Sequence, residues 1–321
     1  MADEFDWIAS LRPLTRGDPR ALELLDDAAV LPARTGQDLV ISVDTMVEGV
    51  HFLADERPDV VARRLLRTSL SDLAAKAARP FGYFLSVAWP DARPSHWRDR
   101  FREGLAQDGD EFGVALLGGD TVATPGPLTV SATVLGWVET GCAVLRSTAG
   151  RGDAALVCGV VGDGWLGLRA ARGELQDAGG RLASHYRTPR PLLALRELLS
   201  DHAHAAADVS DGLLADFGHI AAASGLAVNI ELDRAPLSLS ASAWRANQPD
   251  EAAALMQLAT GGDDYAIACA VAPAEVDDFR GAAAGLGIPA AVVGAFEDGE
   301  GVRITFHGRE VAAPGSLGWR H

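Results

Sequence analysis

Short runs of apolar and β-branched residues recur along the chain and are typical of β-strands. The predicted strands are Leu39–Val43, Tyr83–Ala88, Leu128–Val138, Ala155–Val161, Ala227–Leu232, Tyr265–Val271, Ala291–Val293 and Val302–Phe306. Between several of them lie stretches with apolar residues at helical spacing, which predict helices. The predicted helices are Val60–Ala78, Ser95–Gln107, Leu192–Leu199, Leu213–Ala223 and Glu251–Leu258.

Some predicted strands follow one another directly, whereas others are separated by helices. This mixture favours an α+β or mixed α/β fold over a regular parallel doubly wound sheet. A chain of 321 residues is expected to form two domains at roughly 150 residues each. The segment Glu139–Asp153 is rich in Gly and Arg and separates two strand runs, so it is the predicted boundary. The expected domains are residues 1–140 and 141–321.

The chain is acidic, with 44 Asp and Glu residues against 28 Lys and Arg residues and a formal net charge of −16. No run of basic residues with interleaved aromatic residues offsets this charge, so nucleic-acid binding is disfavoured. Lys76 is the only lysine. This excludes a P-loop, because its phosphate-binding lysine must follow a glycine-rich turn. It also excludes a Schiff-base lysine other than Lys76 itself.

The N-terminal residues are acidic and lack the basic and apolar regions of a secretory signal. No apolar stretch approaches the roughly 18–20 residues that span a bilayer, so no membrane segment is expected. Cys142, Cys158 and Cys269 are far apart and form no CxxC pair. Structural zinc and a disulfide framework are therefore disfavoured. A cytoplasmic protein fits these features best.

Several aspartates lie at the ends of apolar runs or on partly apolar elements, where an unpaired carboxylate is costly. They are Asp26 and Asp27 before an apolar run, Asp44 after Val40–Val43, Asp120 after Leu116–Gly119, and Asp208 and Asp211, with Ser210, after Ala205–Ala207. Any one of them could be an ordinary helix cap or turn residue. The recurrence of the pattern favours a ligand-binding set, because α/β proteins commonly hold ligands at strand ends.

Asp72 lies beside the apolar face of the predicted helix Val60–Ala78, on a stripe with Ser69 and Lys76. It either pairs with Lys76 four residues on or faces an interior cation site, and periodicity alone leaves both open. Oxygen ligands with no cysteine and little histidine suit a hard cation such as Mg²⁺. Many aspartates without a P-loop lysine suggest that metal ions neutralise phosphates, as in phosphoryl transfer.

A set of short motifs in a fixed order resembles the thiamine-monophosphate kinase family. The motifs are Asp26–Val30, Ser42–Phe52, Leu70–Ala75, Leu117–Thr121, Asp208–Leu213 and Gly261–Tyr265, followed by Gly318-Trp319. Each motif alone is weak, but the ordered set covers nearly the whole chain. The acidic turns and the Ser-Asp-Gly step are shared with aminoimidazole ribonucleotide synthetase, selenophosphate synthetase and hydrogenase-maturation proteins.

This resemblance implies a two-domain aminoimidazole ribonucleotide synthetase-like fold. Its N-terminal α/β domain would bind ATP and Mg²⁺ and carry a dimerising sheet, and its C-terminal α/β domain would complete the active site. The implied activity is direct in-line transfer of the γ-phosphoryl group of ATP to thiamine monophosphate. The product would be thiamine diphosphate, in the last step of its biosynthesis. Several Mg²⁺ ions and a homodimer are also implied.

The resemblance further assigns roles position by position. The implied metal ligands are Asp27, Ser42, Asp44, Asp72, Asp120, Asp208 and Asp211, with Asp44, Asp120 and Asp211 as catalytic residues. The implied ATP contacts are Gly119, Asp120, Arg146 and Ser210. The implied contacts to thiamine monophosphate are His51, Asp263 and Trp319, the tryptophan by stacking on a cationic ring. Without the resemblance, His51 and Trp319 would more often be packing residues.

The chain departs from the family pattern at several positions. Glu23-Leu24-Leu25 stands where the family often has Gly-Ile-Gly, which permits close approach of the backbone to phosphate. Val43 replaces a threonine, Ser69 an asparagine, Lys76-Ala77 a Met-Gly pair, and Asp263 a glutamate. No principal aspartate is lost, so we expect activity to survive.

Two other readings compete with the kinase. The first is another enzyme of the superfamily. A selenophosphate synthetase is disfavoured because that family usually has a reactive cysteine or selenocysteine near its N-terminus, and no cysteine precedes Cys142. A hydrogenase-maturation protein is disfavoured because the reactive C-terminal cysteine of that family is missing. A nucleotide-binding sensor without turnover is the alternative from a different class, motivated by the missing Gly-Ile-Gly. An assay for thiamine diphosphate formation would distinguish the kinase from the sensor.

Overall fold

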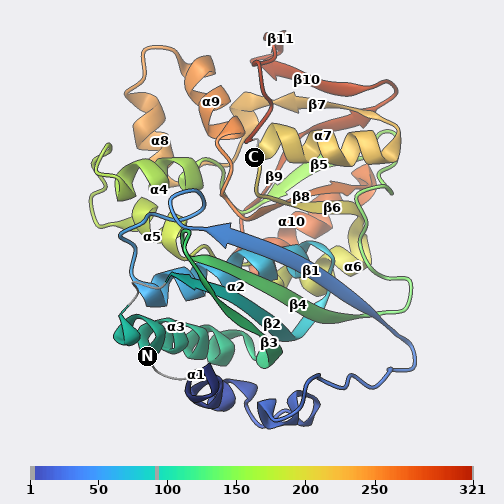
Figure 1. Ribbon diagram of the computed structural model, residues 1–321. Coiled ribbons are helices and arrows are strands. Elements are labelled where there is room, and N and C mark those ends of the chain that lie inside the picture. The colour runs from blue at the N-terminus through green and yellow to red at the C-terminus, as the bar shows by residue number, and fades with distance from the viewer. Residues whose placement is uncertain (1–3, 91–93, 320–321) are drawn as a thin grey trace. The chain divides into compact units, whose positions relative to one another are not determined.

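The computed structural model describes residues 4–90 and 94–319, which form two compact units (Figure 1). Residues up to Leu73 and Ala78–Gly141 form the first unit, and Ala74–Ala77 with the residues from Cys142 onward form the second. Both units combine helices with a sheet, so the predicted α+β, mixed α/β architecture is confirmed. Within the described residues, no helix is long and apolar enough to cross a membrane.

The first unit is a four-stranded sheet with helices on one face. Its strands are β1 (Gln37–Val47), β2 (Arg79–Pro90), β3 (Ala115–Thr124) and β4 (Thr129–Glu139), and its helices are α1 (Glu4–Leu11), α2 (Pro58–Ala75) and α3 (Ser95–Phe112). The strand order is β1-β4-β2-β3, so β1 and β3 are the edges. The β2–β3 pair is parallel and the other pairs are antiparallel.

Strand alternation decides which side chains of the first unit face the helices. Tyr83, Leu85, Val87 and Trp89 of β2 share one core with the buried face of α2 and with Phe101 of α3. The opposite face holds a smaller cluster around Leu117 and Leu135, which the segment containing Ala21 to Leu31 covers.

The second unit is a seven-stranded sheet covered on both faces. Its strands are β5 (Ala154–Cys158), β6 (Ala203–Val209), β7 (Ala227–Glu231), β8 (Ala266–Val271), β9 (Ala290–Glu297), β10 (Gly301–Phe306) and β11 (Arg309–Glu310). Its helices are α4 (Asp163–Ala171), α5 (Arg181–Arg187), α6 (Arg196–His202), α7 (Leu213–Ser224), α8 (Leu239–Ala246), α9 (Glu251–Thr260) and α10 (Val276–Gly285). The order is β11-β10-β7-β9-β5-β8-β6.

The central strands of this sheet are buried along their whole length, which explains their unbroken apolar sequences. Val157 faces a core with Leu213 and Phe217 of α7, whereas Leu156 faces a core with Leu199 of α6 and Phe279 of α10. The sheet therefore lies between two layers of helices, and most of its neighbouring strands are antiparallel.

Three strands were not predicted, β3, β6 and the two-residue β11, and there is a physical reason for the first two. Gly118 and Gly119 resemble a turn, but they lie inside β3, where a Cβ on Gly119 would sit 1.8 Å from the carbonyl oxygen of Leu85. These glycines thus permit close strand approach. The alanines of β6 have no β propensity, yet both faces of the sheet are packed and leave room only for small side chains.

Three predicted details are wrong. Asp44 and Asp120 were expected at strand ends, but β1 and β3 continue three and four residues beyond them, to Val47 and Thr124. The helix expected to reach Ala78 ends at Ala75. The helix expected over Leu192–Leu199 is instead a 3₁₀ turn followed by α6.

Candidate functional site

Ser42, Asp44 and Asp72 form a compact group in the first unit. Strand alternation directs Ser42 and Asp44 of β1 to the face that α2 covers, because their row partners Val134 and Ala132 belong to the helix-facing core. The Ser42 hydroxyl donates a hydrogen bond to the Asp72 carboxylate. The Asp72 side chain therefore faces β1, and its role as a metal ligand stays a prediction.

The electrostatics of this group fit a cation. Burial and then the negative charge of Asp72 raise the pKa of Asp44 to about 6, while a hydrogen bond from Ser69 lowers it. Two carboxylates this close oppose each other's ionisation unless a positive charge lies between them. A donor set made only of oxygen atoms is what Mg²⁺ prefers.

Asp27, Gly119 and Asp120 lie together at a cavity of about 560 Å³ in the same unit. The cavity is lined by apolar residues such as Leu11, Leu24 and Phe84 and by the polar residues Asp26, Asp27, Asp120 and Thr121. Both predicted metal ligands of this group are exposed.

In the loop before Asp27, three non-glycine residues adopt backbone conformations that are typical of glycine. Leu22, Glu23 and Leu24 have φ angles of 48°, 57° and 55°, in the left-handed region that L-residues rarely adopt. Two of the three residues that stand where the family often has Gly-Ile-Gly, Glu23 and Leu24, therefore adopt a left-handed conformation, whereas Leu25 has φ of −106°.

The structure does not bring Asp44 and Asp120 together within the sheet. Asp44, Ala132, Leu85 and Gly119 lie in one row across the strands. Three strand spacings separate the ends of that row, or about 14 Å. Carboxylates that share one Mg²⁺ lie within about 4 Å of each other, since each oxygen is about 2 Å from the metal. One chain therefore holds these residues as two separate groups.

His51 follows β1 in a tight turn. Its Nδ1 accepts a hydrogen bond from the backbone N–H of Val47 at 3.0 Å, and Nε of Arg64 donates to its carbonyl oxygen at 3.2 Å. The ring and the backbone of this predicted substrate contact are both held in place.

The second unit brings four predicted residues together through backbone hydrogen bonds. The N–H of Asp263 donates to the carbonyl of Ser210 at 2.7 Å, and the N–H of Trp319 donates to the carbonyl of Asp211 at 2.9 Å. A Cβ on Gly262 or Gly318 would lie 2.5 Å from one of these carbonyl oxygens. The glycines of both motifs are thus required by close packing.

Asp208 and Trp319 occupy contrasting environments in this unit. Asp208 is buried near the end of β6, and the Trp319 side chain is 56% exposed. A shallow cavity of about 330 Å³ is lined by Trp319, Asp211 and His219. An exposed indole next to a carboxylate can accept a cationic ring.

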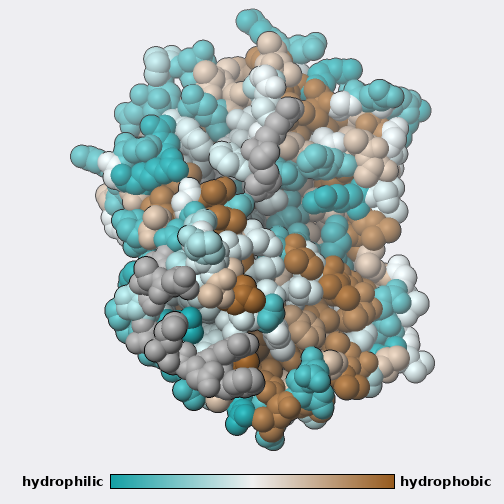
Figure 2. Space-filling model, in the orientation of Figure 1, coloured by the Kyte–Doolittle hydropathy of each residue, from teal (hydrophilic) through white to brown (hydrophobic). Residues whose placement is uncertain are grey.

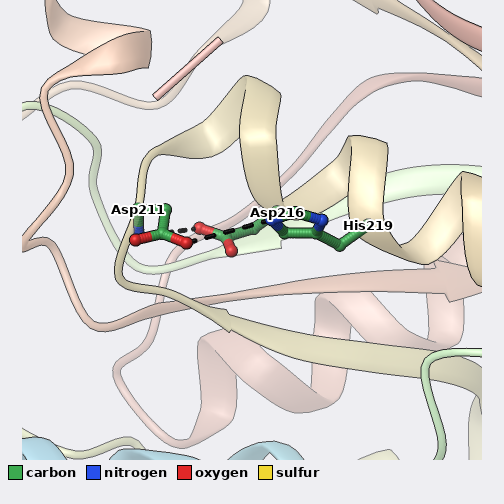
Figure 3. A group of neighbouring side chains, drawn as sticks. All are labelled: Asp211, Asp216 and His219. Atoms are coloured by element: carbon green, nitrogen blue, oxygen red, sulfur yellow. Dashed lines mark hydrogen bonds and ion pairs between the residues drawn. The ribbon is translucent and has the colours of Figure 1, made fainter. Parts of the chain in front are cut away.

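Sequence reasoning missed Asp216, which lies with Asp211 and His219 at the start of α7 (Figure 3). One ligand atom from each of the three lies within 4.8 Å of the others. Asp216 accepts the N–H groups of Asp211 and Gly212 at 3.2 and 3.1 Å. Burial and the charge of Asp211 raise its pKa to about 7, against those hydrogen bonds and the charge of Arg146. The available signal was an aspartate inside the apolar run Leu213–Phe217.

The loop that carries Arg146 is fixed by hydrogen bonds to three successive carbonyls. Lys76 Nζ donates to Val144 at 3.1 Å, the N–H of Ala206 to Leu145 at 3.1 Å, and the Ser224 hydroxyl to Arg146 at 3.1 Å. The Arg146 side chain is exposed. Lys76 also donates to the carbonyl of Ala206 at 2.6 Å, so the only lysine bridges this loop to β6.

The chain matches two domain families: AIR synthase related protein, N-terminal domain, over residues 25–138, and the corresponding C-terminal domain over residues 150–307. It is 58% identical to thiamine-monophosphate kinase of Caulobacter vibrioides over 319 residues, covering 99% of this chain and 90% of the relative. The crystal structure of thiamine-monophosphate kinase from Stenotrophomonas maltophilia superposes with a TM-score of 0.83 at 35% identity, over 97% of this chain and 98% of that one.

A further structure, AaThiL complexed with AMPPCP and TMP, shares the fold with a TM-score of 0.79 at 24% identity. It covers 99% of this chain and 96% of that one. The two-domain architecture that the motifs implied is therefore confirmed.

Proposed function

Because this chain belongs to the thiamine-monophosphate kinase family, we propose that it transfers the γ-phosphoryl group of ATP to the phosphate of thiamine monophosphate. The products are ADP and thiamine diphosphate. The AaThiL complex with AMPPCP and TMP supports ATP as the phosphoryl donor. The cytoplasm, expected from the sequence, remains a prediction.

One observation carries the proposal: backbone hydrogen bonds join the residues proposed for the two substrates. Asp263 is bonded to Ser210 and Trp319 to Asp211, so the proposed thiamine-side residues lie beside a proposed ATP contact and a proposed metal ligand. Transfer between two phosphates requires such proximity, because a large part of the rate enhancement comes from holding both reactants in line.

The oxygen donors of the chain fit Mg²⁺ as the counterion of these phosphates. In the first unit Asp27, Ser42, Asp44, Asp72 and Asp120 would hold it, and in the second unit Asp208 and Asp211 would do so. Bound Mg²⁺ would neutralise charge that develops on the transferred phosphoryl group. Gly119 would let the backbone approach ATP, and Ser210 would donate its hydroxyl.

The remaining polar side chains act directly on the substrates. Arg146 presents a planar guanidinium on a fixed loop and would make bidentate contacts to phosphate. His51 would donate to the phosphate of thiamine monophosphate, Asp263 would contact the cationic part of this substrate, and Trp319 would stack on its ring.

We also propose a homodimer formed by the first unit. Leu39, Ile41 and Val43 project from the face of β1 opposite to Asp44 and are 38%, 55% and 60% exposed. Figure 2 shows hydrophobic surface over the part of the first unit where Figure 1 draws β1. An apolar row on an edge strand is costly in water and is typical of an interface.

A coupled assay tests the proposed activity. Purified protein is incubated with Mg-ATP and thiamine monophosphate, and ADP and thiamine diphosphate are quantified. We expect stoichiometric formation of both, abolished by EDTA and restored by Mg²⁺. Asp44→Asn and Asp120→Asn should each lower turnover at least about a hundredfold, since each removes a charged ligand. Asp38→Asn, an exposed position on the same strand β1, is the matched control and should retain turnover.

Saturable ATP binding without any thiamine diphosphate would reject the kinase and favour the sensor. Wild-type turnover of Asp44→Asn at all Mg²⁺ concentrations would reject the proposed metal ligand.

A further inference from the structure

The second acidic residue of the Gly261–Tyr265 motif has no role in the mechanism above. Asp263 is the proposed substrate contact, whereas the side chain of Asp264 points inward and the residue is only 3% exposed. A carboxylate is seldom buried so deeply without a structural or functional reason, because its desolvation is costly.

Asp264 binds the start of helix α4 with both carboxylate oxygens. Oδ2 accepts the N–H of Gly162 at 2.8 Å, and Oδ1 accepts the N–H of Gly164 at 2.9 Å. These N–H groups belong to the first turn of α4, where backbone donors have no partner within the helix and the helix dipole favours a negative charge. His185 Nε2 lies 3.1 Å from the carbonyl oxygen of Asp264 and holds the main chain from the other side.

The residues on either side of Asp264 have strained backbone conformations. Asp263 has φ of 65° and Tyr265 has φ of 53°, both in the left-handed region that non-glycine residues rarely adopt. Such conformations persist only where the surrounding contacts enforce them, and they concentrate at functional sites. A Cβ on Gly164 would lie 2.2 Å from the carbonyl oxygen of Asp263, so α4 begins in direct contact with the strained turn.

We propose that Asp264 is a positioning residue that clamps this turn to α4 and thereby aims Asp263 at thiamine monophosphate. The proposal rests on the proposed function of Asp263 as a substrate contact. Hydrogen bonds hold the turn at three places. They are the two N–H bonds to the Asp264 carboxylate, the bond from His185 to the Asp264 carbonyl, and the bond from the Asp263 N–H to the Ser210 carbonyl. Without the clamp the strained backbone relaxes, and the Asp263 carboxylate no longer lies where the substrate binds.

Asp264→Asn tests the clamp with almost no change in size. An amide has only one oxygen, so one of the two N–H groups is left facing an NH₂ group. We expect the KM for thiamine monophosphate to rise about tenfold, the effect of losing one hydrogen bond to a charged group, with the KM for ATP unchanged. A merely structural role would lower stability and both substrate affinities alike, so the selective change identifies positioning.

Asp250→Asn is the matched control. Asp250 also caps a helix, α9, but it is exposed and accepts a single N–H, that of Ala253 at 3.0 Å. One amide oxygen can replace this bond, so both KM values should stay at the wild-type level.

His185→Ala provides a second variant, which removes the hydrogen bond to the Asp264 carbonyl but keeps the carboxylate. It should raise the KM for thiamine monophosphate selectively and by less than Asp264→Asn. If Asp264→Asn does not fold, His185→Ala decides the question in the same assay.

Unchanged or equally raised KM values in a folded Asp264→Asn protein would overturn the clamp. A wild-type chain that consumes no thiamine monophosphate would overturn the proposed function and the clamp with it. An active wild type without the selective change would overturn the clamp alone.

Discussion

The imidazole of His51 has one of its ring nitrogens committed to the backbone. Nδ1 accepts the N–H of Val47, so the ring proton of the neutral imidazole is on Nε2. The ring can therefore offer a hydrogen-bond donor to an anion from Nε2 without becoming positively charged. Arg64 fixes the His51 carbonyl and thus the direction of that donor.

We predict that His51→Gln retains more activity than His51→Asn. The glutamine amide can place an N–H near the position of Nε2, whereas the shorter asparagine amide reaches only the position of Nδ1. His51→Asn should raise the KM for thiamine monophosphate about tenfold or more, the effect of one lost bond to a charged group. Steady-state kinetics of both variants check this, and equal losses would contradict a donor at Nε2.

For single residues, the sequence motifs identified candidate site residues more readily than they predicted the surroundings of those residues. The aspartates, glycines and Trp319 could be located from sequence because close packing and cation binding restrict residue choice. Asp216 could not, because its role depends on the backbone N–H groups of Asp211 and Gly212, whose directions no sequence pattern encodes. The left-handed loop at Glu23 was likewise hidden, since its residues are not glycine.

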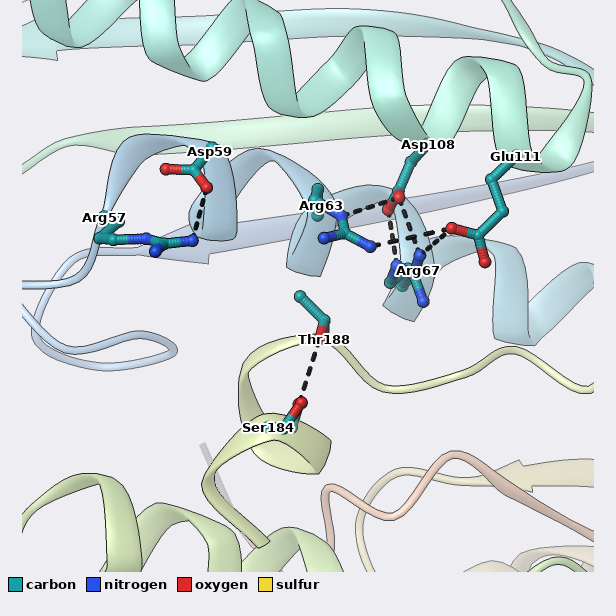
Figure 4. Close-up of polar contacts among 8 residues, drawn as sticks. All are labelled: Arg57, Asp59, Arg63, Arg67, Asp108, Glu111, Ser184 and Thr188. Carbon is teal, nitrogen blue, oxygen red and sulfur yellow. Dashed lines mark hydrogen bonds and ion pairs between the residues drawn. The ribbon is translucent and has the colours of Figure 1, made fainter. Parts of the chain in front are cut away.

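Helices α2 and α3 are joined by a buried ion-pair network (Figure 4). Arg67 binds both oxygens of Asp108 at 2.7 and 2.9 Å, and Arg63 binds one of them at 2.9 Å. The Asp108 side chain is fully buried. Because α2 also carries Asp72, this network holds the helix that supplies one proposed metal ligand.

We predict that Asp108→Asn lowers the free energy of unfolding by about 3–5 kcal/mol, because it leaves buried guanidinium charge without its carboxylate. Asp110→Asn on the same helix is the control. Its side chain is 78% exposed in an ion pair with Arg16, so a change within about 1 kcal/mol is expected. Urea unfolding of the three proteins measures both, and equal effects would contradict the role of burial.

Asp163, the first residue of α4, makes the free energy of unfolding depend on pH. Burial raises the pKa of Asp163, although the Ser238 hydroxyl donates to it at 2.6 Å and lowers it. The folded protein thus prefers the protonated acid. Stability is lost as pH rises from the unfolded value of 3.8 through the higher folded pKa.

We therefore predict that Asp163→Asn gains stability relative to the wild type as pH rises. The difference in unfolding free energy should be smallest near pH 4 and grow as the pH rises, until the folded Asp163 is ionised. Unfolding curves across this range check the sign. A difference that shrinks with rising pH would contradict the burial effect.

Element prediction succeeded where local pattern and tertiary context agreed. The apolar, β-branched runs of β1, β2 and β4 are strands, and the periodic stretches of α2 and α7 are helices. It failed for β3 and β6, where glycine and alanine are selected by packing against neighbouring strands rather than by local propensity. Contacts between distant segments carry that information.

For the whole molecule, the two groups of the first unit lie at opposite edges of one sheet. Asp44 is on β1 and Asp120 is on β3, about 14 Å apart by strand spacing. The exposed apolar row of Leu39, Ile41 and Val43 also lies on β1, on the face opposite to Asp44. If a second copy covers this row and extends past the β1 edge, its Asp27 and Asp120 can meet the Ser42, Asp44 and Asp72 of the first copy.

Complementation between inactive variants tests whether active sites are shared in this way. Asp44→Asn and Asp120→Asn proteins are co-expressed with different affinity tags, and the mixed dimer is isolated through both tags. If each site combines the two groups from different copies, one site of the mixed dimer carries both substitutions and the other carries neither. The mixed dimer then regains turnover, whereas each parent homodimer stays inactive. If each chain supplies both groups to its own site, every site carries one substitution and the mixed dimer stays inactive as well.

Ile41→Asp places a charge in the apolar row and should convert the dimer to monomers, which light scattering measures. Turnover should be lost with the dimer only if the active sites are shared between copies.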